Sequence, residues 1–138
     1  MTTPADLELQ GLIVTTLKAS DDVMALVDGV YDRPPASPFG TKQAYISMGP
    51  SDLQPDDADC IDGETHTIQI DVWSRTPGQV ACKRICGAVK AALHDQDLEL
   101  TENALVQMTL TFQQVFGDPD GLTTHGAMQF TAMAEEPE

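Results

Sequence analysis

Residues 66–79, HTIQIDVWSRTPGQ, change from a strand pattern to a helix pattern within one short segment, and this change limits the possible folds more than any other feature. Apolar and polar residues alternate over residues 66–73, which predicts a strand with one buried face. Trp73, the only tryptophan, ends this strand on the face opposite to its apolar residues. Those apolar residues are Ile68, Ile70 and Val72.

A helix is predicted directly after this strand. Thr76 suits the N-cap, Pro77 the first helical position and Gln79 the capping-box position. Apolar residues then recur at helical spacing to about His94. We therefore expect Trp73, Thr76 and Pro77 to form a structural corner, in which Trp73 packs where the strand meets the helix.

Two more helices are predicted near the N-terminus. Thr3 as N-cap, followed by Pro4, indicates a helix start, and apolar residues at helical spacing predict an amphipathic helix over residues 4–19. Ser20 is a second N-cap, for a short helix through Val27. The first part of the chain is therefore expected to be helical.

Strand patterns also occur on both sides of the helix after Trp73. Alternating residues predict strands at residues 43–49, 106–113 and 128–133, and a short edge strand is expected at residues 98–101. The second of these strands is expected to place on one face Val106, Met108, Leu110 and Phe112. The connections are predicted to be a proline-rich loop at 31–42, an acidic loop at 50–63 and a turn at 118–121.

This order of elements predicts an α+β fold. Its order is helix, short helix, strand, strand, helix, short strand, strand, strand, which favours an antiparallel sheet of about four strands covered on one face by two main helices. The length of 138 residues suits one domain, expected over residues 1–134, with residues 135–138 as a frayed acidic tail.

The composition excludes several classes of protein. Seven Lys and Arg face 22 Asp and Glu, so the formal charge is −15, whereas a nucleic-acid-binding surface is basic. No apolar run is long enough to span a membrane, and the N-terminus lacks the pattern of a signal peptide. Three cysteines do not suit a secreted disulfide framework. We expect a soluble protein inside the cell, without a membrane partner.

The charges are distributed unevenly along the chain. A basic helix face is expected from Lys83, Arg84 and Lys90, and it would meet an acidic surface on another subunit. The alternative is a solvated surface that only increases solubility. The candidate acidic partners lie in the predicted loop and turn: Asp52, Asp56, Asp57, Asp59 and Asp62, with Leu53 among them, and Asp118 and Asp120.

Signals for catalysis and for metal or cofactor binding are weak. His66 is expected to be a hydrogen-bonded histidine at the core margin, and His125 to be exposed. Cys82 and Cys86 share one side of a helix, where burial is favoured over half a metal site. The turn at 118–121 lacks the glutamate that closes a calcium loop. We therefore expect neither an enzyme nor a cofactor.

Several segments, in order, resemble the tail-completion (tail terminator) proteins of long-tailed bacteriophages, prophages and gene transfer agents. The resemblance covers almost the whole chain. An N-terminal amphipathic helix leads into SDDVMALVDGVYDRPP, and AYISMG and an acidic loop follow. The remaining segments are HTIQIDVWSRTPGQVACKRICGAVKAALHD, LELT and FGDPDGLTTHGAMQFTA, of which DVWSR with its helix and the DPDG…THG turn are the most specific.

The resemblance implies a structural protein of the virion tail, assembled in the bacterial cytoplasm. Such proteins form a ring, generally of six copies, on the head-proximal end of the tail tube. The ring ends tube polymerisation and docks to the head connector, so tube and connector proteins are the implied partners. DNA would pass through the lumen without specific binding, and a negative lining would repel its phosphates.

Three other functions stay open from the sequence. The acidity suits a DNA mimic that inhibits a nucleic-acid enzyme, although the acids gather in loops and termini. Another head–tail joining protein would have a similar size and composition. A small metal-dependent enzyme using His66, His125 and the cysteines is the least favoured.

Overall fold

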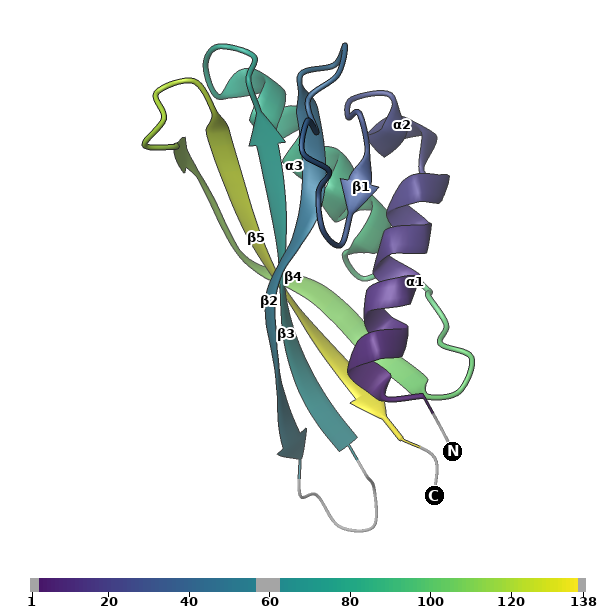
Figure 1. The fold of residues 1–138 in the computed structure, drawn as a ribbon. Coiled ribbons are helices and arrows are strands. Elements are labelled where there is room, and N and C mark those ends of the chain that lie inside the picture. Colours follow the sequence, from purple (N-terminus) through teal and green to yellow (C-terminus); the bar gives the residue numbers. More distant parts are fainter. Residues whose placement is uncertain (1–2, 57–62, 137–138) are drawn as a thin grey trace.

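The computed structural model describes residues 3–56 and 63–136, and it confirms the α+β class (Figure 1). The helices are α1 (Ala5–Ala19), α2 (Asp21–Met24) and α3 (Val80–Leu93). The strands are β1 (Val30–Tyr31), β2 (Ala44–Asp56), β3 (Gly63–Ser74), β4 (Ala104–Gly117) and β5 (Thr124–Glu135). No helix in these described ranges is long and apolar enough to cross a membrane.

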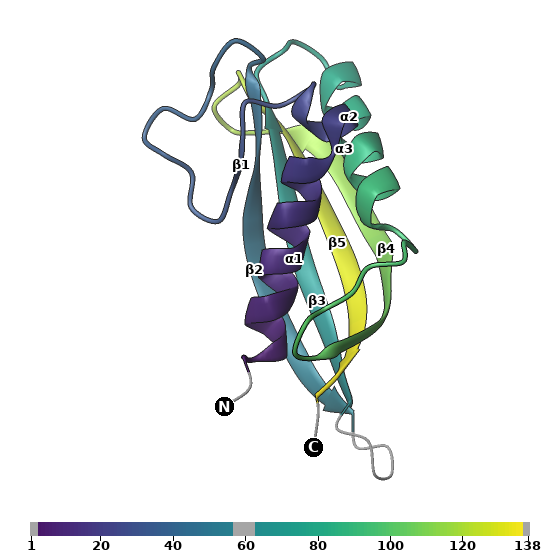
Figure 2. The same ribbon diagram turned by 90° about the vertical axis from the view of Figure 1, so that its right-hand side faces the viewer.

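The strands form one five-stranded sheet in the order β1-β2-β3-β5-β4. All neighbouring strands are antiparallel except β1 and β2, which are parallel. The helices lie together on one face of this sheet, with α1 and α3 in front of it in Figure 2. The other face carries no helix, and we call it the open face.

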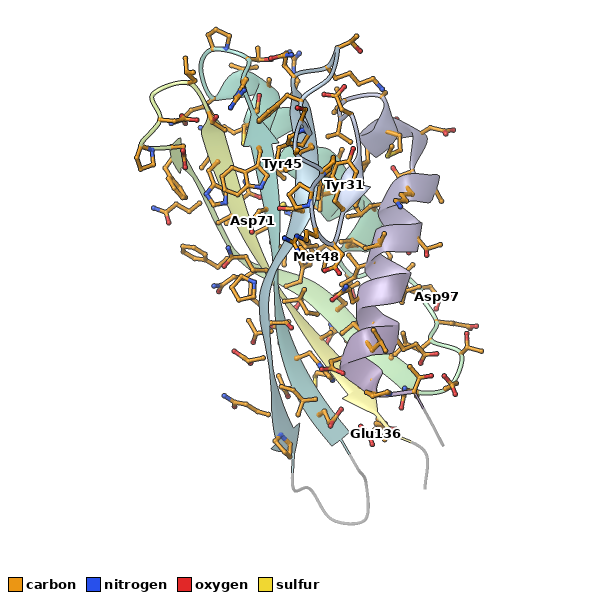
Figure 3. The ribbon with its side chains drawn as sticks, viewed as in Figure 1. Tyr31, Tyr45, Met48, Asp71, Asp97 and Glu136 are labelled. Atoms are coloured by element: carbon orange, nitrogen blue, oxygen red, sulfur yellow. The ribbon has the colours of Figure 1, made fainter. Side chains whose placement is uncertain are left out.

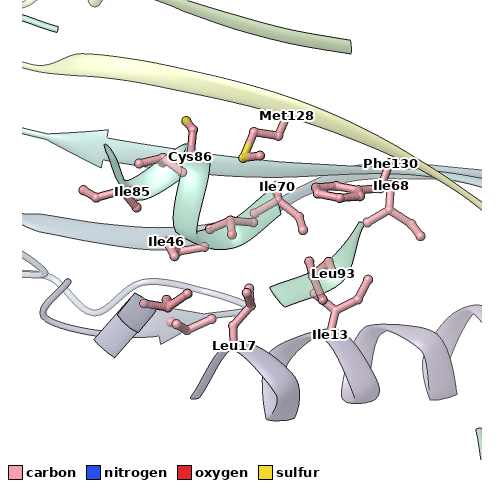
Figure 4. Close-up of a cluster of buried hydrophobic side chains, with 14 of the residues drawn as sticks. Ile13, Leu17, Ile46, Ile68, Ile70, Ile85, Cys86, Leu93, Met128 and Phe130 are labelled. Atoms are coloured by element: carbon pink, nitrogen blue, oxygen red, sulfur yellow. The ribbon is translucent and has the colours of Figure 1, made fainter. Parts of the chain in front are cut away.

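The hydrophobic core lies between the sheet and the helices (Figure 4). The predicted apolar alternation of β3 is confirmed, because Ile68, Ile70 and Val72 are all buried there. β5 contributes Met128 and Phe130 from the same face. The helices contribute mainly Leu9, Ile13, Leu17, Ile85, Val89 and Leu93. The periodicity of the sequence therefore identified the covered face of the sheet.

The predicted helix starts are partly wrong. α1 begins at Ala5 with Pro4 at the N-cap, and Thr3 makes no capping hydrogen bond. For α2 the cap prediction is confirmed, because Ser20 Oγ accepts from the Val23 N–H at 3.2 Å, but the helix ends at Met24 and not at Val27.

The start of α3 differs most from the prediction. Thr76 is not its N-cap and Pro77 is not its first residue, because α3 begins at Val80 after Gln79. Gly78 has a φ of +85°, in the left-handed region, so the helix cannot continue back through it. The Pro77-Gly78 pair instead makes a turn, and the Gly78 carbonyl accepts from Thr124 Oγ1 at 3.2 Å. The C-terminal end agrees with the prediction, with His94 at the C-cap.

The described part of the predicted acidic loop, residues 50–56 and 63, is strand. β2 continues to Asp56 and pairs with β3 from its start at Gly63, so Asp52 and Leu53 lie in a strand. The prolines of this segment are tolerated because that half of β2 has no strand on its other side. Asp57, Asp59 and Asp62 lie outside the described residues.

The predicted edge strand at residues 98–101 is also wrong. The fifth strand is β1, and residues 101–103 are held by the carboxylate of Glu8 on α1. Burial alone would raise the pKa of Glu8, but the N–H groups of Glu102, Asn103 and Thr101 and the Asn103 side chain lower it overall. Hydrogen bonds to this carboxylate therefore replace strand pairing.

β4 is longer than predicted, and its faces are not the ones expected. The register shifts between Leu105 and Gln107 and again between Leu110 and Phe112. Each shift inserts an extra residue and reverses the alternation beyond it. Met108 remains buried, whereas Val106 and Phe112 are exposed. The expectation that these apolar residues share one face is therefore wrong.

Candidate functional site

The open face of the sheet is the first candidate contact surface, because no helix of the described residues covers it (Figure 2). The register aligns its side chains in rows across β2, β3, β5 and β4. Figure 3 shows Tyr45 and Asp71 on it, away from α1. One end of the open face is aromatic and the other is rich in threonine and glutamine.

The aromatic row joins four strands. Trp73 stacks on His125 with ring centroids 3.9 Å apart and lies 6.2 Å from Tyr45. Phe116 lies 4.8 Å from His125 on the other side. The indole N–H of Trp73 donates to Ser47 Oγ at 2.9 Å. The predicted corner is therefore wrong: Trp73 packs across the helix-free face and not against α3.

His125 is half-buried in this row and not exposed as predicted. Its Nε2 lies 2.6 Å from Oδ1 of Asp71, which also accepts from Gln69 Nε2 at 2.8 Å. Burial raises the pKa of the Tyr45 hydroxyl, Arg75 opposes this and Asp71 adds to it. The aromatic row thus contains a histidine–carboxylate pair that adds a polar centre to the stacked rings.

Arg75 lies beside the aromatic row. Its guanidinium carbon is 4.2 Å from the centroid of the Phe39 ring, and its Nε donates to Thr123 Oγ1 at 3.4 Å. With the proline-rich loop 34–38 it lines an open groove of about 550 Å³. The attraction between this cation and the aromatic ring holds the guanidinium at the groove.

The other end of the open face is polar but almost uncharged. In β3 and β5 it presents Thr67, Gln69, Gln129 and Thr131, and in β4 Thr109, while Phe112 and Met133 are exposed apolar side chains among them. Asp52 of β2 is exposed there opposite Thr67. Among the described residues, no Lys or Arg stands at this end of the open face, whereas a nucleic-acid-binding sheet has a basic footprint.

The predicted basic residues lie together on α3. Lys83, Arg84 and Lys90 are all exposed, and none forms an ion pair with another described residue. Beneath them Cys82 and Cys86 are buried, as predicted. A Cβ added at Gly126 would lie 2.7 Å from Cys86 Sγ and 3.0 Å from Cys82 Sγ, so both thiols are packed against β5. The hydrogen bond to Cys82 and burial raise the pKa of Cys86.

The remaining predicted acids have local roles or stand apart. Asp120 accepts from the Thr123 hydroxyl at 2.6 Å and from the Leu122 and Thr123 N–H groups, which lowers its pKa. Asp118 is half-buried in the same turn, so the turn prediction is confirmed. Leu53 is 36% exposed on the covered side, opposite His66 and far along the sheet from the turn.

His66 is predicted to be a hydrogen-bonded histidine at the core margin, but it is fully buried and its Nε2 has no hydrogen-bond partner among the described residues. Its Nε2 lies 3.3 Å from Glu64 Oε1 without the geometry of a hydrogen bond. Burial and Glu136 raise the pKa of Glu64, while His66 opposes them. Within the described ranges, no group of three or more His, Cys, Asp or Glu side chains could hold a metal.

Sequence reasoning missed most of the aromatic row. Tyr45, Ser47, Asp71 and Phe116 meet only because the register places them beside Trp73 and His125. Alternation in β2 and β3 places Tyr45, Ser47 and Asp71 on the same face as Trp73. Alternation in β4 places Phe116 there only when the bulge between Leu110 and Phe112 is taken into account.

The fold and its surfaces define a small α+β protein with an open sheet face and an exposed basic helix. Residues 11–135 match the model of the tail completion protein gp17 family, and the chain belongs to this family. The resemblance seen in the sequence is thereby confirmed.

Two solved structures are similar over nearly their full length. One is a chain in the virion of a native gene transfer agent particle, with a TM-score of 0.82, 27% identity and coverage of 92% of this chain and 94% of that chain. The other is the gp17 protein of bacteriophage SPP1, with a TM-score of 0.60, 24% identity and coverage of 97% and 91%, which shows the shared fold. No curated protein matches the chain.

Proposed function

We propose that this chain is a structural protein of a phage or gene transfer agent particle, and that it completes the tail. It forms a ring of six copies at the head-proximal end of the tail tube, ends tube polymerisation and joins the tube to the head connector. The observation that carries the proposal is the likeness, at a TM-score of 0.82, to a chain of a gene transfer agent virion. The family match over residues 11–135 supports it.

The contact between copies in this ring joins α3 to acids of the neighbouring copy. A closed ring is built from two different patches on each copy, so segregated charges suit it. Lys83, Arg84 and Lys90 are exposed and have no described carboxylate as ion-pair partner, which leaves them available. The exposed Asp52 is the best-placed candidate acid, because it lies on a strand and not in a hydrogen-bonded turn.

The lumen of the ring lets DNA pass without binding it. The net charge of −15 repels phosphates, and the end of the open face rich in threonine and glutamine carries no Lys or Arg among its described residues. An acidic protein with these surfaces would also suit the alternative function, that of another head–tail joining protein. The comparisons favour these structural roles over a DNA mimic.

Deletion of the gene in the producing strain, followed by negative-stain electron microscopy, tests the proposal. We expect abnormally long or unjoined tails beside filled heads, and the wild-type gene supplied in trans should restore joined particles. Normal and infectious particles from the deletion strain would overturn the proposal, and inhibition of a nucleic-acid enzyme as a DNA mimic would become the favoured function.

Charge reversal at Lys83 and Arg84 tests the contact between copies. The double variant Lys83→Glu/Arg84→Glu should fail to restore joined particles in the deletion strain. Lys18→Glu, on the exposed end of α1, is the matched control for a reversed surface charge. Full restoration by the double variant would remove α3 from the interface.

A further inference from the structure

β4 is a long strand at the end of the sheet with no strand on its outer side. Its 14 residues, ALVQMTLTFQQVFG, contain no charged residue and no proline. Soluble proteins usually interrupt or charge such an edge, because its free N–H and C=O groups can pair with another chain. The protein is strongly acidic, yet β4 has neither charges nor prolines, and this requires an explanation.

The middle of this edge is closed by the end of α3. The Asp95 N–H donates to the Met108 carbonyl at 2.8 Å, and the Leu110 N–H donates to His94 Nδ1 at 2.9 Å. Two outward backbone groups near the centre of β4, the Met108 carbonyl and the Leu110 N–H, therefore have partners within the same chain. These contacts also fix which residues of β4 turn their backbone outward.

Beyond Leu110 the outward groups are free. Before the register shift between Leu110 and Phe112, the even-numbered residues Met108 and Leu110 direct their backbone groups outward. The shift adds one residue, so beyond it Gln113, Val115 and Gly117 direct their N–H and C=O groups away from β5. Within the described part of the chain, none of these groups has a hydrogen-bond partner on that side. Residues 111–117, TFQQVFG, therefore form an open edge, which we call the pairing edge.

The other free edge of the sheet is built differently. The half of β2 beyond Met48 has no partner on its outer side, and it contains Pro50 and Pro55 together with Asp52 and Asp56. Prolines and charges are the residues that discourage pairing between edges. One edge of the sheet is thus protected, and the pairing edge is not.

We propose that the pairing edge binds an extended segment of a second copy of this chain through backbone hydrogen bonds. Copies with a charge of −15 repel each other, and an uncharged strip is where they approach at the lowest cost. Phe112 is 51% exposed on this segment and supplies apolar area to the same contact. Backbone pairing gives the affinity in this mode of association. The inference rests on the proposed ring, for which it names a contact surface.

Isosteric Gln→Glu substitutions, which add negative charges to the pairing edge, test this inference. The exposed residues Gln113 and Gln114 are changed together, as Gln113→Glu/Gln114→Glu, in the strain that lacks the gene. Like charges introduced there should reduce incorporation into purified particles roughly tenfold. The control, Gln54→Glu/Gln79→Glu, adds the same charge at exposed positions away from β4 and should stay within about twofold of wild type.

The outcomes separate the two proposals. Circular dichroism and thermal melting first establish that each purified variant folds. A folded edge variant that is incorporated like wild type would overturn the pairing edge while leaving the ring intact. Normal particles from the uncomplemented deletion strain would instead overturn the proposed function. Hydrogen exchange gives a second measurement: the outward amides of Gln113, Val115 and Gly117 should be protected in particles and exchange freely in the isolated protein, and free exchange in particles would contradict pairing.

Discussion

The two faces of the sheet are stabilised by different interactions. On the covered face, Ile70, Met128 and Phe130 are fully buried against the helices, so apolar burial stabilises that face. On the open face, Trp73 and His125 stack only on neighbours across the strands, and beyond them most side chains are threonine and glutamine, with Phe112 and Met133 exposed among them. One face is complete within a single chain, whereas the other leaves its side chains available to partners.

Truncation of a phenylalanine on each face should break or support this comparison most clearly. Phe130→Ala removes a fully buried ring and should lower the free energy of unfolding by about 3–5 kcal/mol. Phe112→Ala, on the open face, removes a ring that is 51% exposed and should cost less than about 1 kcal/mol. Urea unfolding measures both, and equal losses would contradict the division into two faces.

A methyl group added to the covered face should have the next largest effect. In Gly126→Ala the new Cβ would lie 2.7 Å from Cys86 Sγ, so overpacking should cost about 1–3 kcal/mol. Combining it with Cys86→Ala makes room, and the double variant should be more stable than the sum of the single changes predicts. Strict additivity in denaturant unfolding would show that the thiol is not the obstacle.

On the open face, the hydrogen bond of the tryptophan should have a smaller effect. Trp73→Phe keeps an aromatic ring against His125 but loses the donor to Ser47 Oγ, and about 1 kcal/mol of stability should be lost. Ser47→Ala removes the other partner. If the bond matters, the double variant should lose less than the two single losses together, as measured by thermal unfolding.

The smallest effect is expected where α1 is tied to the start of β4. Because the folded-state pKa of Glu8 is lowered from its ordinary 4.5, its contribution is present above that pH and is lost as the pH falls through the folded value. Glu8→Gln should therefore be less stable than wild type at neutral pH, and the difference should shrink at about pH 3. Urea midpoints at both pH values measure this, and a difference independent of pH would contradict it.

The sequence predicted the covered face better than the open one, for a physical reason. Burial of Ile68, Ile70 and Val72 follows from alternation, which a single strand shows by itself. The stacking of Trp73 on His125 depends instead on pairing between strands distant in the chain. Register across a sheet is not written in either strand alone.

Local signals failed where tertiary contacts outweighed them. The capping pattern at Thr76 was overridden by the left-handed turn at Gly78, and the prolines of β2 were tolerated on an edge that pairs on one side only. The bulge before Phe112 reversed an alternation that looked regular in the sequence. The basic residues of α3 were correctly expected to be exposed neighbours, but no pattern in the sequence identified the free backbone of β4.

The strand order also has a kinetic consequence. β2 and β3 form one hairpin and β4 and β5 another, and the two hairpins meet only along β3 and β5, which α3 and β4 separate in the chain. Each hairpin forms from contacts near in sequence, whereas the seam requires a long segment to close. We expect folding to be limited by the joining of two preformed halves, so that Ile70 and Met128, which face each other across that seam, govern how fast the native protein appears.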